Sequence, residues 1–172
     1  MRQPLMVMQL RTPATDSSLQ RPFSGAYGTG VRTPSENNPL GIHQGWDLLA
    51  SPGTIAYSVA KGTVHEVYPH LPGYGLAVVI QFEFRGRQLY AIYGHLTRVA
   101  VNKNQPVNEG DPVAWTGTSG NAGDTEPHLH FGIMTSPVPL HGMTNFISPG
   151  HVLGYTPVRG LTTDDHTRLD VG

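Results

Sequence analysis

The chain contains no cysteine, and this absence removes several kinds of chemistry at once. Without thiols there is no disulfide framework, no thiolate metal site and no cysteine nucleophile, so any metal must be held by histidine and carboxylate. Nine histidines and 12 acidic residues leave that option open. The absence does not indicate a compartment, because secreted enzymes can also lack cysteine.

Long apolar runs and an excess of charge are missing as well. The first apolar run, Leu5 to Leu10, is interrupted by Gln9 and stops at Arg11, which is too short for the apolar core of a signal peptide. No stretch approaches the roughly 20 apolar residues of a membrane span, so we expect none. Eleven basic and 12 acidic residues give a net charge of −1, so there is no basic surface to attract phosphate groups, and we expect no nucleic-acid partner.

What is present favours short strands in one domain. A chain of 172 residues is typical of a single domain with a real core. Its 38% hydrophobic content, 21 glycines and 15 prolines are typical of strands joined by turns. We therefore predict a mainly β fold with an antiparallel β-sheet core, long loops and little helix. The expected organisation is an N-terminal lead-in over 1–20, a main domain over 21–156 and a polar, flexible tail over 157–172.

The middle of the chain reads as a β-hairpin that ends in a histidine. In "GLAVVIQFEF" the apolar residues Ile80, Phe82 and Phe84 alternate with polar ones, which is the pattern of a strand with one buried face. The turn formers at 85–87 then lead into "QLYAIYGHL", so the two segments are expected to pair. Alternation places His95, at the end of the second strand, on the apolar face. A buried, hydrogen-bonded histidine is thus an alternative to a catalytic one.

The stretch "EPHLHFGI" holds two histidines two positions apart. On a strand, Leu129, Phe131 and Ile133 would point into a core. His128 and His130 would point the other way, with their Cα atoms roughly 7 Å apart. One imidazole could then bind a metal while its neighbour reaches a water on the same ion. A solvated strand face with two surface histidines is the alternative.

A second pair stands in "GIHQGWDLLA", where three residues separate His43 from Asp47. Pro39, Gly41 and Gly45 argue against a helix that would place the pair on one face. On a straight strand the two residues would lie roughly 13 Å apart, at the limit for sharing one ion, so we expect a bend near Gly45. The alternative is a surface histidine and a turn-forming aspartate.

Taken together, the three segments point to a catalytic metal site. One histidine and one aspartate from the first pair, with one histidine from the HxH pair, make three N/O ligands of the kind that hold a catalytic zinc and keep its fourth position for water. His95 and the other member of the HxH pair would then handle protons. Five histidines fall in no paired spacing and are expected to be surface or structural residues: His65, His70, His141, His151 and His166.

These motifs resemble the lysostaphin/LytM-type zinc endopeptidases, which cut peptide bonds in bacterial peptidoglycan. That family pairs HxxxD with HxH and carries a histidine at the end of a core strand between them, as "YGHL" does here. "ASPGTIAYSVAKGTV" and "EGDPVAWTGTSGNAGDTEPHLHFGI" are also similar to family patterns, and the likeness runs from about Tyr27 to about Gly154. Three departures stand out: a longer loop before His43, Gly132 in place of the usual glutamate, and an inserted "AGDTE". The first and third would border the groove and so bear on substrate preference.

The resemblance implies roles for individual residues and a substrate. It implies that His43, Asp47 and His130 bind zinc (Zn2+), that His95 and His128 are catalytic, and that 21–156 is a metallopeptidase domain with a groove across the metal. The expected partners are peptidoglycan stem peptides and their cross-links. We expect His128 to act as general base and His95 to hold the water or the oxyanion, although spacing alone would allow the reverse. Glu126 is a rival base.

Three questions stay open at this stage. The site would also suit an amidase or carboxypeptidase, or a catalytically inactive module that binds cell wall. The bond cut would be either a direct D-Ala to diaminopimelate cross-link or a glycine bridge. The substrate lies in the periplasm or the extracellular wall, yet no signal peptide is visible. We therefore expect a leader outside this sequence, a phage-borne lytic enzyme, or an antibacterial effector injected into rival cells, which would need an inhibitor (immunity) protein in the producer.

Overall fold

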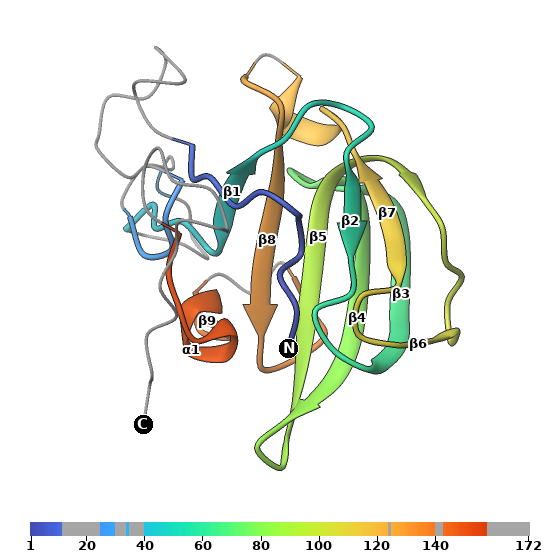
Figure 1. The fold of residues 1–172 in the computed structure, drawn as a ribbon. Coiled ribbons are helices and arrows are strands. Elements are labelled where there is room, and N and C mark those ends of the chain that lie inside the picture. Colours follow the sequence, from blue (N-terminus) through green and yellow to red (C-terminus); the bar gives the residue numbers. More distant parts are fainter. Residues whose placement is uncertain (12–24, 30–33, 35–39, 124, 140–142, 158–172) are drawn as a thin grey trace.

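The computed structural model describes residues 1–11, 25–29, 34, 40–123, 125–139 and 143–157. Within these residues nine strands form one antiparallel sheet, accompanied by two short helices, which confirms the predicted mainly β fold (Figure 1). The strands are β1 (Trp46–Leu49), β2 (Ile55–Tyr57), β3 (Gly62–Leu71), β4 (Gly75–Phe84), β5 (Arg87–Val99), β6 (Pro106–Val107), β7 (Pro112–Thr116), β8 (His128–Met134) and β9 (Phe146–Ile147). The helices are η1 (Gly120–Ala122) and α1 (Pro149–Leu153).

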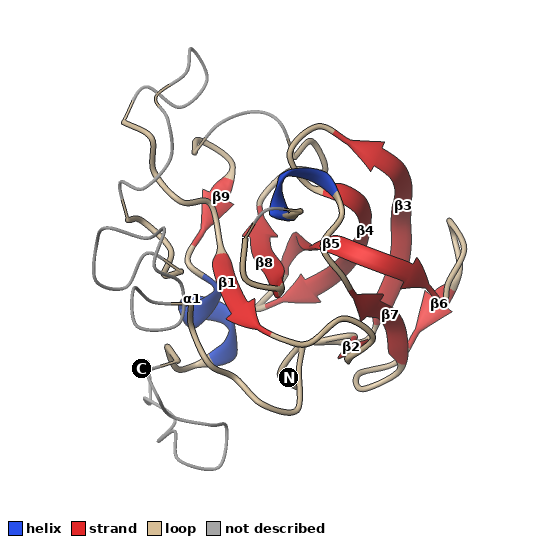
Figure 2. Ribbon diagram, turned by 90° about the horizontal axis from the view of Figure 1, so that it is seen from above, coloured by secondary structure: helices blue, strands red, loops and turns tan. Residues whose placement is uncertain are grey.

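The order of the strands makes the three motif-bearing segments neighbours. The main path runs β1-β8-β5-β4-β3-β6, while β7 pairs with β2 and β5, and β9 pairs with β8. The long strand β5 pairs with β4 and β8 over its first part and with β7 at its end, so the sheet curls around it (Figure 2). As a result, β1, β8 and β5 lie side by side although they are far apart in the sequence.

The predicted hairpin between β4 and β5 is confirmed. Phe84 pairs with Arg87 across a two-residue loop in which Arg85 and Gly86 have φ angles of 50° and 72°. Two consecutive positive φ angles match the turn type that suits the right-handed twist of paired strands. This tight connection sets the register between β4 and β5 and leaves the end of β5 free to reach the site.

The core lies on both faces of the sheet, in two clusters. The larger contains Leu129, Phe131 and Ile133 from β8, as the alternation predicted, together with Leu89, Ala91, Tyr93 and Leu96 from β5. The smaller lies on the opposite face: Leu71, Tyr74, Ala77, Val79, Tyr90, Ile92, Met134 and Phe146. Since successive strand residues alternate between faces, His128 and His130 share the face of the smaller cluster.

The N-terminal segment 1–11 packs against the larger cluster. Its Leu5, Met8 and Leu10 are fully buried there. Its backbone is held to the segment around β2 at one end and to β1 at the other, where the Leu49 N–H donates to the Gln9 carbonyl at 2.8 Å (Figure 1). Because each buried leucine contributes roughly 1.5–3 kcal/mol, this segment is a substantial part of the core.

No helix in the described part of the chain is long and apolar enough to cross a membrane.

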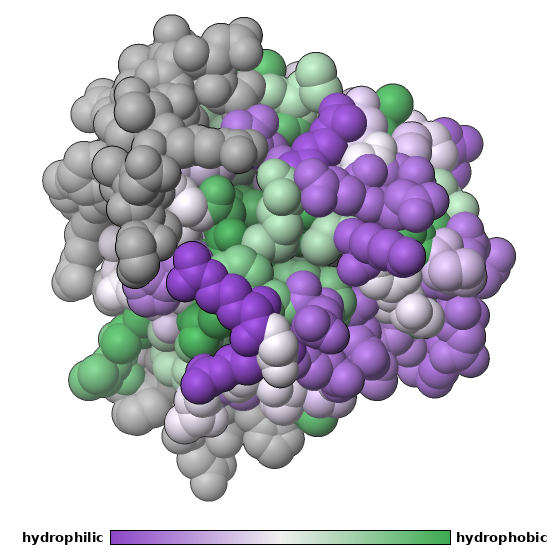
Figure 3. Space-filling view, turned by 60° about the horizontal axis from the view of Figure 1, so that its bottom comes forward, coloured by the Kyte–Doolittle hydropathy of each residue, from purple (hydrophilic) through white to green (hydrophobic). Residues whose placement is uncertain are grey.

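At the end of the molecule that carries the β4–β5 turn, a hydrophobic hollow is bordered by hydrophilic side chains (Figure 3). A cavity of about 490 Å³ lies between the β4–β5 turn and α1, and its lining includes Phe84, Arg87, Ile147 and His151.

Candidate metal centre and active site

Strand register brings the two paired motifs together. Asp47 of β1 lies opposite His130 of β8, and His130 in turn lies opposite Gly94 of β5. His43 precedes β1, and the chain bends at Gly45 as the sequence predicted. At that bend a Cβ atom would lie 2.3 Å from the carbonyl oxygen of Phe131, so only glycine lets the backbone pass this close to β8.

Three ligand atoms converge at this point. The Asp47 Oδ1 atom lies 3.1 Å from His43 Nε2 and 3.0 Å from His130 Nδ1, and the two ring nitrogens are 3.3 Å apart. Bonds of about 2.0–2.1 Å to a tetrahedral zinc place neighbouring ligand atoms about 3.3 Å from one another. All three side chains are buried, and their donor set of two imidazoles and a carboxylate suits zinc. The residues therefore fit one zinc ion.

Hydrogen bonds to backbone carbonyls orient three of the imidazoles. His43 Nδ1 lies 3.1 Å from the Ala26 carbonyl, His95 Nδ1 lies 2.9 Å from that of Ser119, and His128 Nδ1 lies 2.7 Å from that of Glu126. A carbonyl only accepts, so each Nδ1 donates, and the neutral ring then presents an unprotonated Nε2. His43 thus offers a ligand atom, while His95 and His128 offer proton acceptors.

The two catalytic candidates adjoin the ligand cluster. The ring centroids of His95 and His128 are 4.8 Å apart, those of His95 and His130 are 6.1 Å apart, and His128 Nε2 lies 3.6 Å from Asp47 Oδ1. His95 is 4% exposed and His128 is 2% exposed, so neither is a solvated surface residue. All five residues that the sequence pointed to lie in one buried group.

Burial controls the charge of the two catalytic candidates. It lowers the pKa of His95 to about 3, with the neighbouring His128 and His130 acting in the same direction and Asp47 opposing them. Burial also lowers the pKa of His128, while Asp47 and the Glu126 carbonyl act to raise it. Since desolvation disfavours the charged ring, both histidines are neutral near pH 7 and can accept a proton.

His95 reaches the site by a break in strand alternation, and the face predicted for it was wrong. Tyr93 and Leu96 both belong to the larger core cluster, so a regular strand would not keep its alternation between them. His95 instead has a φ angle of 59°, and the pairing of β5 with β4 shifts register at this point. The Tyr74 carbonyl accepts its N–H at 2.7 Å. This bulge turns the ring to the opposite face, towards His128.

Comparison with known proteins places this constellation in a family. The family model described as Peptidase family M23 matches residues 41–141, more than half of the chain. The chain therefore belongs to peptidase family M23. That range includes all five site residues.

This M23 domain is similar to two named relatives and to one solved structure. It is 33% identical over 101 residues to the peptidoglycan DD-endopeptidase ShyA of Vibrio cholerae, covering 59% of this chain and 22% of that protein. It is 27% identical over 157 residues to lysostaphin of Staphylococcus staphylolyticus, covering 86% and 31%. The chain thus spans less than a third of either relative. The catalytic domain of the prophage-encoded M23 protein EnpA from Enterococcus faecalis superposes with a TM-score of 0.57 at 25% identity, covering 73% of this chain and 86% of that domain.

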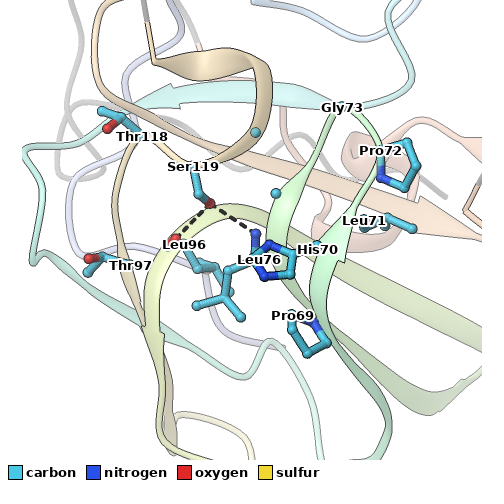
Figure 4. Close-up of a pocket in the computed structure, with 12 residues that line it drawn as sticks. Pro69, His70, Leu71, Pro72, Gly73, Leu76, Leu96, Thr97, Thr118 and Ser119 are labelled. Atoms are coloured by element: carbon cyan, nitrogen blue, oxygen red, sulfur yellow. Dashed lines mark hydrogen bonds between the residues drawn. The ribbon is translucent and has the colours of Figure 1, made fainter.

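Ser119 holds the bulged end of β5 in this M23 domain. Its hydroxyl donates to the Leu96 carbonyl at 2.7 Å and accepts the Leu76 N–H at 3.0 Å (Figure 4). Its own carbonyl accepts from His95 Nδ1 at 2.9 Å. A cavity of about 730 Å³ opens beside it, lined by the β3–β4 turn and by residues that follow His95. Sequence reasoning did not single out Ser119.

Arg11 is a member of the site that sequence reasoning missed. Its side chain is 3% exposed, and Nη1 lies 3.5 Å from Asp47 Oδ2 and 3.4 Å from His128 Nδ1. No motif marks it. The one signal was that Arg11 ends the apolar run of the N-terminal segment, which reads as the start of a loop.

The remaining candidates are Glu126 and the histidines outside the paired motifs. The Glu126 carbonyl orients His128, whereas its side-chain Oε2 is buried without a hydrogen bond among the described residues. His70 and His151 are exposed, and the ring of His65 packs against Tyr90, as expected for histidines outside the site. The other two unpaired histidines, His141 and His166, lie outside the described residues.

Proposed function

We propose that this M23 domain is a zinc-dependent endopeptidase that hydrolyses the peptide cross-links of bacterial peptidoglycan. One observation carries the proposal: three ligand atoms spaced for a single zinc lie beside two neutral imidazoles that present Nε2. The substrate class is supported by the name of the relative ShyA, which describes it as a peptidoglycan DD-endopeptidase. The proposal also places the enzyme's action in the periplasm or the extracellular wall, where peptidoglycan lies.

His43 Nε2, Asp47 Oδ1 and His130 Nδ1 would hold the zinc. When bound there, zinc makes water more acidic and polarises a carbonyl oxygen. The protein's own contribution is the fixed geometry of the ligands. The Ala26 carbonyl sets the tautomer of His43, and the strand register holds Asp47 opposite His130.

His128 is the proposed general base. Its Nε2 is the proton acceptor that lies 3.6 Å from Asp47 Oδ1, next to the ligand cluster. Taking a proton from the attacking water makes the ring cationic; Asp47 and the Glu126 carbonyl favour that cation, whereas Arg11 and His130 oppose it. The ring then returns the proton to the leaving amine. For Glu126, only the backbone carbonyl makes a hydrogen bond to His128, so we assign the carboxylate no part in proton transfer.

His95 is proposed to orient the attacking water. Because the Ser119 carbonyl accepts from Nδ1, the neutral ring presents an Nε2 that can accept a hydrogen bond but cannot donate one. The low pKa of about 3 keeps it in that form. His95 Nε2 can therefore accept a hydrogen bond from one hydrogen of the attacking water while His128 removes the other. An oxyanion needs a hydrogen-bond donor, which this nitrogen does not provide.

Digestion of purified sacculi tests the function. Sacculi with direct cross-links and sacculi with glycine bridges are treated with the protein as isolated, after chelation and after zinc is restored, and the fragments are weighed by mass spectrometry. We expect opened cross-links that disappear with chelator and return with zinc. Free whole stem peptides would indicate an amidase instead, and free D-alanine a carboxypeptidase. Bound zinc without any product would indicate a wall-binding module.

The route to the wall remains part of the proposal. An antibacterial effector would require a protective inhibitor in the producing cell, and such an inhibitor must block the groove over the zinc site. Co-expression with neighbouring genes, followed by the sacculus assay, tests this. Loss of hydrolysis with one co-expressed protein would support the effector role.

A further inference from the structure

The cavity between the β4–β5 turn and α1 has no part in the proposed reaction. The turn and α1 lie at the end of the molecule where β8 finishes (Figure 1). Thr135 lines the cavity and follows the proposed zinc ligand His130 by five residues. At about 3.4 Å per residue, the cavity is therefore roughly 17 Å from the ligand cluster. Its volume of about 490 Å³ is typical of pockets that bind small ligands.

The floor of the cavity is an open edge of the larger core cluster. Leu89 of β5 and Val152 of α1 belong to that cluster and are buried. Phe84 of β4 and Ile147 of β9 pack against it and are only half-buried. Because the latter two also line the cavity, part of their apolar surface faces it. An apolar group that enters the cavity is therefore removed from water, which favours binding.

The rim of the cavity is cationic. Arg85 and Arg87 come from the hairpin turn and His151 from α1, and all three are exposed. The Arg85 guanidinium lies 5.2 Å from the ring centre of Phe84. The side chain of Arg87 forms no ion pair and no hydrogen bond with any described residue. Its guanidinium is therefore accessible to a ligand at the mouth of the cavity.

No negative charge within the cavity offsets this rim. None of the described residues that line it is acidic. Glu83 precedes Phe84 in β4, but strand alternation turns its side chain to the other face of the hairpin from Phe84 and its partner Arg87. The guanidinium fork pairs with a carboxylate through two parallel N–H donors. A ligand that suits both rim and floor therefore carries a carboxylate next to an apolar part.

The free end of a peptidoglycan stem peptide combines these two features. It ends in D-alanine, whose methyl group and carboxylate are bonded to the same carbon atom, and the diaminopimelate before it adds a chain of methylene groups. A phosphate group would match the arginine but would leave the apolar floor without a partner. Because the wall polymer repeats its stem peptides, one molecule could hold a free stem peptide here while the zinc site acts on a nearby cross-link.

We propose that this cavity is a second wall-binding site, which takes the free D-alanine end of a stem peptide with its carboxylate on Arg87 and its methyl group against the apolar floor. The inference rests on the proposed function and deepens it. The site takes no part in the chemistry. It raises the effective concentration of cross-links at the zinc site, because a molecule already held on the polymer meets them without a new encounter.

Titration of a stem peptide into the zinc-loaded protein tests the contact. The probe is the tetrapeptide that ends in D-alanine, and its control is the same peptide with the terminal carboxylate converted to a carboxamide. We expect the NMR amide signals of Leu89, Thr135 and Val152 to shift and to saturate with the probe. The carboxamide peptide should bind about 3- to 10-fold more weakly, a range between an exposed ion pair and a hydrogen bond to a charged group.

Three variants separate this contact from the rest of the molecule. R87Q removes the charge, R87K keeps the charge without the fork, and R98Q is the control. Arg98 lies towards the other end of β5, with its guanidinium 3.7 Å from the ring centre of Trp115. R87Q should bind the probe as weakly as the carboxamide peptide, R87K should be intermediate, and R98Q should match the wild type. Thermal unfolding checks that each variant is folded. If R87Q does not fold, R87K decides, and wild-type affinity in R87K would overturn the bidentate contact.

Hydrolysis supplies a second readout that separates the polymer from a single cross-link. On a soluble cross-linked peptide dimer, R87Q should match the wild type in kcat/KM, because the zinc site alone decides that rate. On sacculi, the amount of wall that gives the half-maximal rate should rise about 3- to 10-fold in R87Q, since the second contact with the polymer is lost. The maximal rate should not change.

Three results would overturn the inference. The first is a titration in which the amide signals of the cavity do not shift, and the second is equal binding of the carboxylate and carboxamide peptides. The third is an equal loss by R87Q on the dimer and on sacculi, which would show that Arg87 acts through the fold or the zinc site. If the wild type opens no cross-link, the proposed function fails, and the titration still tests the cavity by itself.

Discussion

β8 and the end of β5 both deliver candidate catalytic histidines to the same site, but they do so with opposite backbone geometry. In β8 a regular strand turns His128 and His130 to one face while Leu129 enters the core on the other. In β5 alternation fails at His95, where a left-handed residue turns the ring across the sheet. A regular strand can be read from its pattern, whereas a bulge depends on what surrounds it.

The largest effect is expected from a substitution in the regular strand β8. His130→Ala removes a ligand atom 3.0 Å from Asp47 Oδ1, so zinc content should fall from one per chain to near zero and hydrolysis to background. Metal analysis and the sacculus assay measure both. Because Leu129 still anchors the strand, the variant should keep its β-rich circular dichroism. Retained zinc with normal activity would remove His130 from the site.

The neighbouring His128→Ala should separate catalysis from metal binding. We expect zinc to stay bound while kcat falls by about 10²- to 10⁴-fold, the usual contribution of a general base. Glu126→Ala is the matched control, since its backbone carbonyl still orients His128. An inactive Glu126→Ala with zinc retained would transfer the role of base to that carboxylate.

The bulge in β5 that carries His95 is tested by the pH dependence of the free energy of unfolding. The pKa of His95 is about 3 in the folded chain and near 6.5 when unfolded, so between these values the unfolded state binds more protons. The metal-free protein should therefore lose stability as pH falls from about 6.5 towards 3, by up to a few kcal/mol from this group. Denaturant unfolding of wild type and His95→Gln at several pH values measures it. An identical slope in both proteins would mean that His95 is not held neutral.

The smallest effect is expected at Ser119, which supports the bulge in β5 through hydrogen bonds. Ser119→Ala removes the hydroxyl that joins the Leu96 carbonyl to the Leu76 N–H, and should lower the free energy of unfolding by about 1–3 kcal/mol. The backbone carbonyl that orients His95 remains, so kcat should fall only a few-fold. Ser136, whose hydroxyl accepts from Asn145 away from the site, provides the comparison variant Ser136→Ala. A kcat loss as large as that of His128→Ala would make Ser119 a direct participant.

Much of the site could be predicted because its motifs are local. The distance between His43 and Asp47 required a bend, and glycine at 45 supplied it where a Cβ would strike β8. The apolar and polar alternation of β8 sorted core from site residues without any knowledge of the neighbouring strands. The turn at 85–87 likewise carried the residues that a tight hairpin needs.

The positions of His95 and Arg11 could not be predicted in this way. Alternation gave His95 the wrong face because the bulge is stabilised by Tyr74 and Ser119, which lie some 20 residues away on either side. In the sequence, Arg11 only ends an apolar run. Its position in the site depends on hydrogen bonds to Asp47 and Gly25, which the sequence does not reveal. In both cases the deciding partners are distant in sequence.

By itself, then, the sequence determined the mainly β fold through its periodicity and turn signals, and it predicted the zinc-ligand set and the catalytic pair from motif spacing together with the family resemblance. Only the tertiary structure decided which nitrogen each ring presents, which face His95 occupies and that Arg11 lies in the site. These depend on backbone carbonyls and strand edges brought together by folding, and no local pattern encodes such contacts.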